Sequence, residues 1–198
     1  MHPTLLIVPG LRDHVAQHWQ TLLAAGRSDV LSVPPMGRDD LDCQARVDAI
    51  ERAAQSVAGP IVIVAHSGGC IMVAHWARQT RRTVQAALLA TPPDFDTPMP
   101  EGYPTLDALR ESGWFPVPRS HLPFPALVAA SRNDPLGRYE RVTALARDWG
   151  AHLADLGEVG HLNPASGFGA WPAAQTLINH AIALSPQPVL KEPPCTDK

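Results

Sequence analysis

Cysteine is scarce in this 198-residue sequence. Its three cysteines, Cys43, Cys70 and Cys195, lie far apart and form no C-x-x-C pair, which argues against a disulfide framework and a structural zinc site. Positive charge is not in excess, because 16 Lys and Arg face 19 Asp and Glu, so no nucleic-acid surface is expected. The apolar run Leu5–Val8 is too short for a signal-peptide core or a membrane-spanning helix. We therefore expect a cytoplasmic protein that binds neither nucleic acid nor a membrane.

Short apolar segments alternate with longer helical patterns along the chain. The expected strands are Leu5–Val8, Val30–Val33, Ile61–Ala65, Ala86–Ala90, Ala126–Ala130 and His152–Leu156. The expected helices cover about 15–25, 39–59, 69–80, 138–149 and 173–184. Most of the strand segments are apolar throughout, which is typical of parallel sheets covered on both faces. The pattern predicts a single α/β domain over residues 1–184, with a mostly parallel sheet of about six strands and helices on both faces.

Proline is unevenly distributed. Nine of the 21 prolines fall between Thr91 and Pro125, and each removes a backbone donor and restricts the preceding residue. We therefore expect an irregular cap or insertion over residues 91–125. Residues 185–198 carry four more prolines and little that could pack, so we expect a flexible C-terminal tail.

The sharpest local signal is a serine between an apolar strand and an apolar helix, in the segment Ile61–Cys70. A tight strand–turn–helix elbow around a nucleophilic serine needs small residues two positions before and after it. Ala65 and Gly69 meet that need around Ser67. The alternative is a glycine-rich loop that packs or binds phosphate, but neither the P-loop pattern nor G-x-G-x-x-G occurs. H-E-x-x-H is also missing, and we expect neither a metal nor a cofactor.

A serine nucleophile requires a base and an acid to orient the base. Asp134 and His161 each follow an expected strand, so both belong at the same sheet edge as Ser67. The chain order Ser67, Asp134, His161 is that of α/β-hydrolases. Asp94 and Asp96 follow the strand Ala86–Ala90 and are alternative acids, although they resemble turn formers.

Acyl chemistry also needs donors for the developing oxyanion. We expect one from the backbone N–H of Gly68, directly after the serine, and one from Leu11 in the loop after the first strand. His66 is expected to point away from the nucleophile, and His75 to pack within the following helix. Cys70 is expected to be a small buried hydrophobe.

These motifs together resemble the small α/β-hydrolases related to retinoblastoma-binding protein 9 and the bacterial YdeN-like hydrolases. The matching segments are Val8–Leu11, His18–Trp19, Ala65–Gly69, Ser131–Pro135, Gly160–Asn163, Ser166–Gly169 and Trp171–Pro172. The resemblance implies a shortened hydrolase sheet, a triad of Ser67, Asp134 and His161, and activity on small esters or amides. The family's usual glycine at position 65 is alanine here.

Three aromatic residues are candidates for the substrate pocket. Trp19 lies near the expected oxyanion loop, while Trp114 and Phe115 lie in the expected cap.

The sequence predicts a serine hydrolase that cleaves small carboxylic esters or amides through an acyl-enzyme on Ser67. An acyltransferase and a non-catalytic protein-binding module on the same scaffold are the alternatives. A protein partner is compatible with the sequence but not indicated by it.

Overall fold

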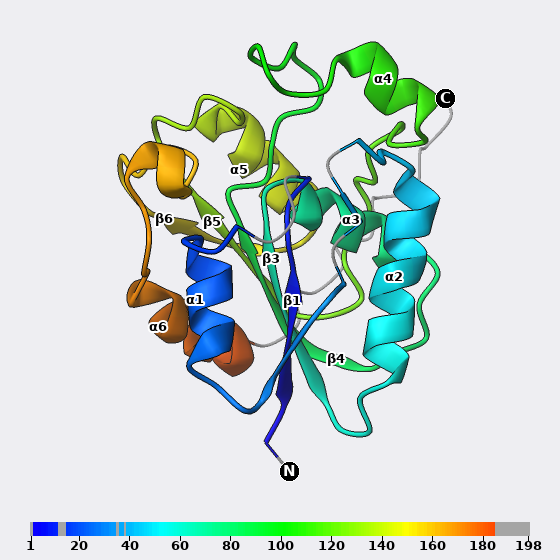
Figure 1. Cartoon of the computed structure of the whole chain (residues 1–198), viewed down its shortest axis with the longest axis vertical. Coiled ribbons are helices and arrows are strands. Elements are labelled where there is room, and N and C mark those ends of the chain that lie inside the picture. Colours follow the sequence, from blue (N-terminus) through cyan, green and yellow to red (C-terminus); the bar gives the residue numbers. More distant parts are fainter. Residues whose placement is uncertain (1, 12–14, 35, 38, 185–198) are drawn as a thin grey trace, which may run out of the picture.

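A computed structural model describes residues 2–11, 15–34, 36–37 and 39–184 (Figure 1). The tail expected over 185–198 lies outside these described residues. Within them, no helix has the length and apolar character needed to cross a membrane.

The core of the fold is a six-stranded parallel sheet with the strand order β2-β1-β3-β4-β5-β6. Its strands are β1 (Thr4–Val8), β2 (Val30–Ser32), β3 (Ile61–His66), β4 (Val84–Ala90), β5 (Ala126–Ala130) and β6 (His152–Asp155). Side chains of β3 and β5 are buried along their whole length, as expected for strands covered on both faces. The predicted α/β class with a parallel sheet of six strands is confirmed.

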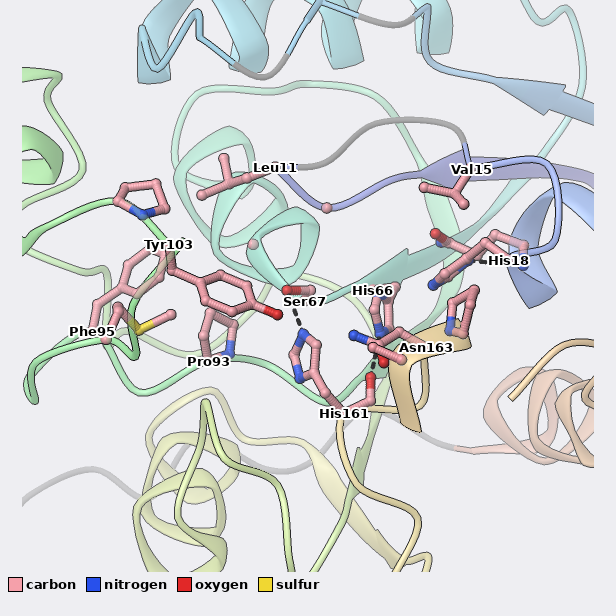
Figure 2. Close-up of a pocket in the computed structure, with 18 of the residues that line it drawn as sticks. Leu11, Val15, His18, His66, Ser67, Pro93, Phe95, Tyr103, His161 and Asn163 are labelled. Carbon is pink, nitrogen blue, oxygen red and sulfur yellow. Dashed lines mark hydrogen bonds between the residues drawn. The ribbon is translucent and has the colours of Figure 1, made fainter. Parts of the chain in front are cut away.

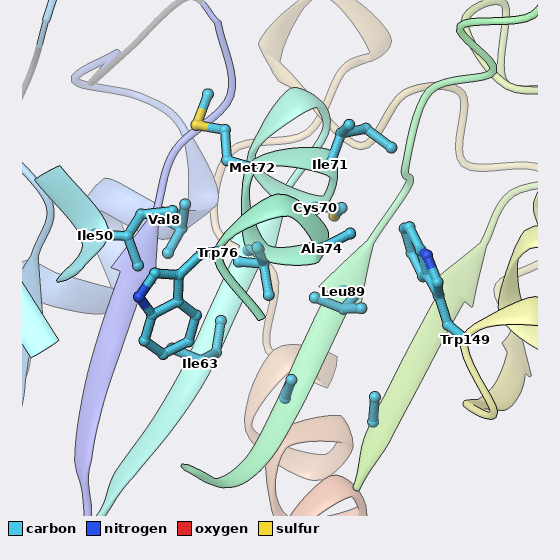
Figure 3. Close-up of a cluster of buried hydrophobic side chains, with 14 of the residues drawn as sticks. Val8, Ile50, Ile63, Cys70, Ile71, Met72, Ala74, Trp76, Leu89 and Trp149 are labelled. Carbon is cyan, nitrogen blue, oxygen red and sulfur yellow. The ribbon is translucent and has the colours of Figure 1, made fainter. Parts of the chain in front are cut away.

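Helices cover both faces of the sheet. They are α1 (Trp19–Ala25), α2 (Cys43–Gln55), α3 (Gly68–Ala77), α5 (Tyr139–Asp148) and α6 (Ala173–Ala183), while a further helix, α4 (Leu106–Glu111), lies within residues 91–125. The sheet has a hydrophobic core on each face, and alternate residues of β3 point into opposite cores. Ile61 and Ile63 pack with α2, α3 and α5, while Val62 and Val64 pack with α1 and α6. Figure 3 shows the first core, where α3 lies over the sheet. Two apolar layers therefore hold the sheet in place from both sides.

Two helices begin later than the sequence pattern predicts, because side chains cap them. The backbone N–H of Gln20 donates to the imidazole of His18, so α1 starts at Trp19. The carboxylate of Asp42 accepts a hydrogen bond of 2.9 Å from Ala45 N, so α2 starts at Cys43. An accepting side chain at this position satisfies a donor that the first helical turn leaves unpaired.

The cap (residues 91–125) holds one short helix, α4, and is otherwise irregular. Its first part, through α4, lies above the carboxyl ends of the strands at the top of Figure 1, and the remainder leads to the amino end of β5. Its two ends are tied together and to α5 by ion pairs: Arg119 contacts Asp96 at 2.6 Å and Asp148 at 2.8 Å, and Arg141 contacts Asp96 at 2.5 Å. Because these charges share partners, the pairs form a network, which stabilises more than isolated surface pairs do.

Candidate active site

Ser67 lies at the apex of a sharp turn between β3 and α3. Its φ of 55° and ψ of −133° are unusual for a residue with a side chain, and such strain is typical of functional turns. The turn is held by Ser67 N, which donates to the carbonyl of Ala90. A Cβ at Gly69 would lie 2.6 Å from the oxygen of Val8 and 2.7 Å from that of Pro9. The close approach of α3 to the end of β1 therefore requires glycine at position 69.

Ala65 fits this turn without distortion. It lies in β3, paired with Val8 of β1 and Leu89 of β4, and is fully buried in the core on the α2 and α3 side. Its methyl group contributes to that core. Alanine at position 65 is therefore accommodated as a strand residue.

A chain of hydrogen bonds joins Ser67, His161 and Asp134. His161 Nε2 lies 2.8 Å from Ser67 Oγ, and His161 Nδ1 lies 3.0 and 2.9 Å from the two carboxylate oxygens of Asp134. An ionised carboxylate only accepts hydrogen bonds, so Nδ1 carries the hydrogen and Nε2 is left to accept from the hydroxyl of Ser67. The backbone N–H of Leu136 donates to Asp134 Oδ1 and fixes the carboxylate. The structure thus brings together all three residues predicted for the triad.

The loops that carry Asp134 and His161 are linked by two side chains that the sequence analysis did not single out for this purpose. Gly160 N donates to Asn133 Oδ1 at 2.7 Å, and Val159 N donates to Ser131 Oγ at 3.2 Å. The hydroxyl of Ser131 in turn donates to Asn133 Oδ1. These bonds fix the separation of the two loops on either side of the Asp134–His161 contact. Their only signal in the sequence was membership of the Ser131–Pro135 motif.

The expected oxyanion residues lie next to Ser67. Gly68 is the first residue of α3, and a Cβ on it would lie 2.9 Å from Leu11 Cγ. A Cβ on Gly10 would lie 3.0 Å from Ser67 Cβ, so the loop after β1 passes directly over the serine. Leu11 and Gly68 both line the cavity that contains Ser67.

That cavity has a volume of about 610 Å³ (Figure 2). On one side of Ser67, Leu11 and the cap residues Pro93, Phe95 and Tyr103 form a mainly apolar wall, with the hydroxyl of Tyr103 directed toward Ser67. On the other side lie Val15, His18, His66 and Asn163. The remaining lining residues are Gly10, Gln20, Asp39, Gly68, Met99, Gly102, Pro104, His161, Pro164 and Ala165. The expected cap does border the site, but Trp114 and Phe115, the cap residues expected in the pocket, are not among those that line the cavity.

The three aromatic residues expected in the pocket lie elsewhere. Trp19 is buried in the core between the sheet and α6, with its ring against that of Trp171. Trp114 is fully buried on the other face, where its indole N–H donates to the carbonyl of Leu41 at 2.7 Å. Phe115 packs against that same core. The expectation was wrong because these large rings gain more from burial within the core than at an open cavity.

His66 also differs from expectation, because it lines the cavity instead of pointing away from it. Its Nε2 lies 2.9 Å from the backbone carbonyl of His161, so this nitrogen donates. The ring lies between those of His18 and His161, with centroid distances of 4.6 and 5.0 Å. Burial holds the pKa of His66 well below its usual range, and the neighbouring charges of His161 and His18 act in the same direction. His66 is therefore neutral and ties the strand before Ser67 to the loop of His161.

This buried neutral histidine predicts a loss of stability in acid. On unfolding, the pKa of His66 returns to about 6.5, so below that pH the unfolded chain binds a proton that the folded protein does not. Its contribution to stability is complete above pH 6.5 and declines as the pH falls below it. The amide of His66→Gln can donate the same hydrogen bond but does not titrate. Between pH 7.5 and 5.5 we expect this variant to lose about 1 kcal/mol less unfolding free energy than the wild type.

Urea unfolding followed by fluorescence at the two pH values measures the difference. Equal losses of unfolding free energy in the two proteins would show that the folded state binds a proton on His66 as readily as the unfolded chain does, which would contradict the prediction. The variant His180→Gln, which changes an exposed histidine of α6, serves as the control and should follow the wild type.

The other candidates have structural contacts of their own. Asp94, weighed as an alternative acid, pairs with Arg141 at 3.3 Å and accepts from Asp96 N, while Asp96 belongs to the ion network of the cap. His75 bonds the carbonyl of Trp114. Cys70 is fully buried, which raises the pKa of its thiol well above the usual range. No group of three or more metal-binding side chains occurs within the described residues.

Comparisons with known proteins give a consistent result. The family model described as serine hydrolase matches residues 5–180. A protein described as a YdeN-like hydrolase from Pectobacterium atrosepticum is 26% identical, with 90% of each chain covered and a TM-score of 0.77. The ydeN gene product of B. subtilis is 19% identical over 92% of this chain and 100% of its own, with a TM-score of 0.67.

A third similar structure is Est1E from Butyrivibrio proteoclasticus, solved with ferulic acid. It is 15% identical, covers 92% of this chain and 90% of its own, and has a TM-score of 0.67. No curated protein sequence gave a significant match. The resemblance to YdeN-like hydrolases that the motifs indicated is confirmed.

Proposed function

Because this chain belongs to the serine hydrolase family, we propose that it cleaves small carboxylic esters or amides through an acyl-enzyme on Ser67. The observation that carries the proposal is the continuous set of hydrogen bonds from Ser67 through His161 to Asp134. A hydroxyl is a poor nucleophile at neutral pH, and it becomes a good one when an oriented imidazole accepts its proton. All three groups lie in or beside one cavity, so a substrate can reach the serine.

The reaction runs in two steps. In the first, Ser67 Oγ attacks the carbonyl carbon while His161 Nε2 takes its proton, and the bond to the alcohol breaks as His161 returns that proton to the leaving oxygen. In the second, water attacks the acyl group and gives a proton to His161, which returns it to Ser67 Oγ as the acid leaves. Asp134 holds the imidazole in its reactive tautomer and stabilises its transient positive charge.

The negative charge that develops on the substrate oxygen needs donors close to Ser67. The backbone N–H groups of Gly68 and Leu11 are our candidates. Gly68 lies at the N-terminus of α3. The backbone N–H groups there have no acceptor within the helix, and the helix dipole favours negative charge. Leu11 packs directly against Gly68. Two such donors contribute to catalysis by fitting the transition state better than the substrate.

Other acceptors than water are compatible with this chemistry, since an acyltransferase uses the same acyl-enzyme. A protein-binding role on the same scaffold is not favoured by any contact described above. The cytoplasmic location suggested by the sequence stays a prediction.

Labelling with a fluorophosphonate probe tests the proposal. We expect the native protein to react at one site, and mass spectrometry of its peptides to find the adduct on Ser67. Heat-unfolded protein is the control and should not react, because the serine is activated only when His161 is in place. Native protein that stays unlabelled, or that carries the adduct on another residue, would contradict the proposed nucleophile.

A further inference from the structure

The cavity around Ser67 has two chemically different halves. On the cap side, Phe95, Met99 and Tyr103 join Pro93, Pro104 and Leu11. On the other side, the imidazole of His18 and the amides of Gln20 and Asn163 border the cavity together with Val15, Pro164 and Ala165. Figure 2 shows Phe95 and Tyr103 on one side of Ser67 and His18 and Asn163 on the other. A substrate that spans Ser67 therefore meets a mainly apolar surface at one end and a surface with more polar groups at the other.

In the apolar half, Phe95 is held in place by its surroundings. Phe95 is 3% exposed, and its ring lies edge-on to that of the buried Trp114, with 5.7 Å between their centroids. The residues on either side of Phe95 are fixed by the pairing of Arg141 with Asp94 and Asp96. A preorganised apolar wall binds an apolar group without first losing its own conformational freedom. The cavity of about 610 Å³ must hold both ends of the substrate, which limits the acyl group to a compact shape such as a ring or a short branched chain.

The polar half lies on the side of the base. Asn163 follows His161 by two residues, and Pro164 and Ala165 of the same loop also line the cavity. Asn163 is fixed there, because Ser166 N donates to its side-chain oxygen at 2.9 Å. A leaving group that receives its proton from His161 must lie close to Nε2, and so must the water that later takes its place. Polar side chains suit both the departing alcohol and the arriving water.

On the basis of the proposed function, we infer that the substrate carries a compact apolar acyl group toward the cap and a small polar alcohol toward His18 and Asn163. The acyl group stays attached to Ser67 through both steps, so its burial among Phe95, Met99 and Tyr103 stabilises both transition states. The alcohol is released after the first step, and the polar half then admits water. Phe95, Met99 and Tyr103 are accordingly the residues that determine specificity.

Two isomeric esters separate the halves of the cavity. Methyl phenylacetate has an apolar acyl group and a small alcohol, while benzyl acetate has the same atoms with the ring on the alcohol. Each kcat/KM is divided by the ester's rate of hydrolysis by hydroxide, which removes the difference in intrinsic reactivity. We expect methyl phenylacetate to be preferred by about 10-fold or more, the effect of placing one apolar group in the pocket that fits it.

A matched pair of methionine variants locates the preference. Met99 and Met36 are both partly buried and pack against the same core, but only Met99 lines the cavity. Met99→Gln places an amide in the apolar half at nearly constant length, and we expect the preference to fall about 3-fold or more. Met36→Gln should keep the wild-type ratio.

The possible results are distinguishable. Preference for benzyl acetate, or an equal loss of preference in both methionine variants, would overturn this assignment while leaving the proposed function intact. If Ser67 reacts with the fluorophosphonate but neither ester is cleaved, the inferred substrate class is wrong. If Ser67 does not react, the proposed function itself fails.

Discussion

We expect the Asp134→Asn variant to fold normally and to lose about 10⁴-fold in kcat, with a small change in KM. The reason is the direction of one hydrogen bond. Asp134 Oδ1 already accepts from Leu136 N at 2.8 Å, so an asparagine keeps its oxygen there and turns its NH₂ group toward His161. The NH₂ group then donates to Nδ1, which moves the imidazole hydrogen to Nε2. Nε2 can no longer accept the proton of Ser67.

Steady-state kinetics on an ester substrate measure this loss of kcat, and two further variants serve as references. Ser67→Ala removes the nucleophile and sets the background rate. Asp94→Asn applies the same substitution to the alternative acid, whose carboxylate pairs with Arg141, and should stay within a few-fold of the wild type. If Asp94→Asn lowered kcat more than Asp134→Asn does, Asp94 and not Asp134 would be the acid that orients His161.

The Gly69→Ala variant is expected to have the largest effect on stability. The added Cβ would lie 2.6 Å from Val8 O and 2.7 Å from Pro9 O, and both are backbone atoms that cannot rotate away. Either α3 or the end of β1 must shift, at a cost of about 2–3 kcal/mol of unfolding free energy. Because Pro9 belongs to the loop that carries Leu11, we expect kcat to fall as well.

The matched control is Gly26→Ala. Gly26 ends α1 with a φ of −90°, and the nearest atom to a Cβ there is 4.0 Å away. We expect its unfolding free energy to stay within about 0.5 kcal/mol of the wild type. Urea unfolding of both variants measures this free energy. Similar losses in the two variants would mean that the backbone at the end of β1 shifts at little cost in free energy.

Strand ends were the most predictable part of the site. Ser67 and Asp134 follow short apolar segments whose length and composition specify buried parallel strands, and His161 follows the partly exposed edge strand β6. Parallel strands present their carboxyl ends at one edge, so the meeting of these three residues followed from local patterns. The same patterns could not locate the ends of α1 and α2, which depend on the caps His18 and Asp42.

The cap was predictable as a region but not residue by residue. Its prolines excluded long regular structure, but the path of the chain between them depends on distant contacts. Trp114 turns inward because its indole meets the carbonyl of Leu41, a residue far away in the sequence. Phe95 is placed by the ring of the buried Trp114 and by the pairing of its neighbours Asp94 and Asp96 with Arg141. His66 escaped prediction because its position depends on the backbone of His161.

The ion network of the cap brings Asp96 and Arg119 together, so residues 97–118 between them form a closed loop. Asp96 leads into it and Arg119 ends it, and these two residues contact each other at 2.6 Å while both are tied to α5. The loop between them is therefore closed by this contact before the chain continues to the amino end of β5. The cost of closing such a loop rises only slowly with its length. Residues 97–104 of this loop border the cavity and are not buried, whereas Leu109 and Trp114 are fully buried in the core. Evolution or engineering could thus shorten, extend or exchange residues 97–104 and change the cap above an unchanged Ser67.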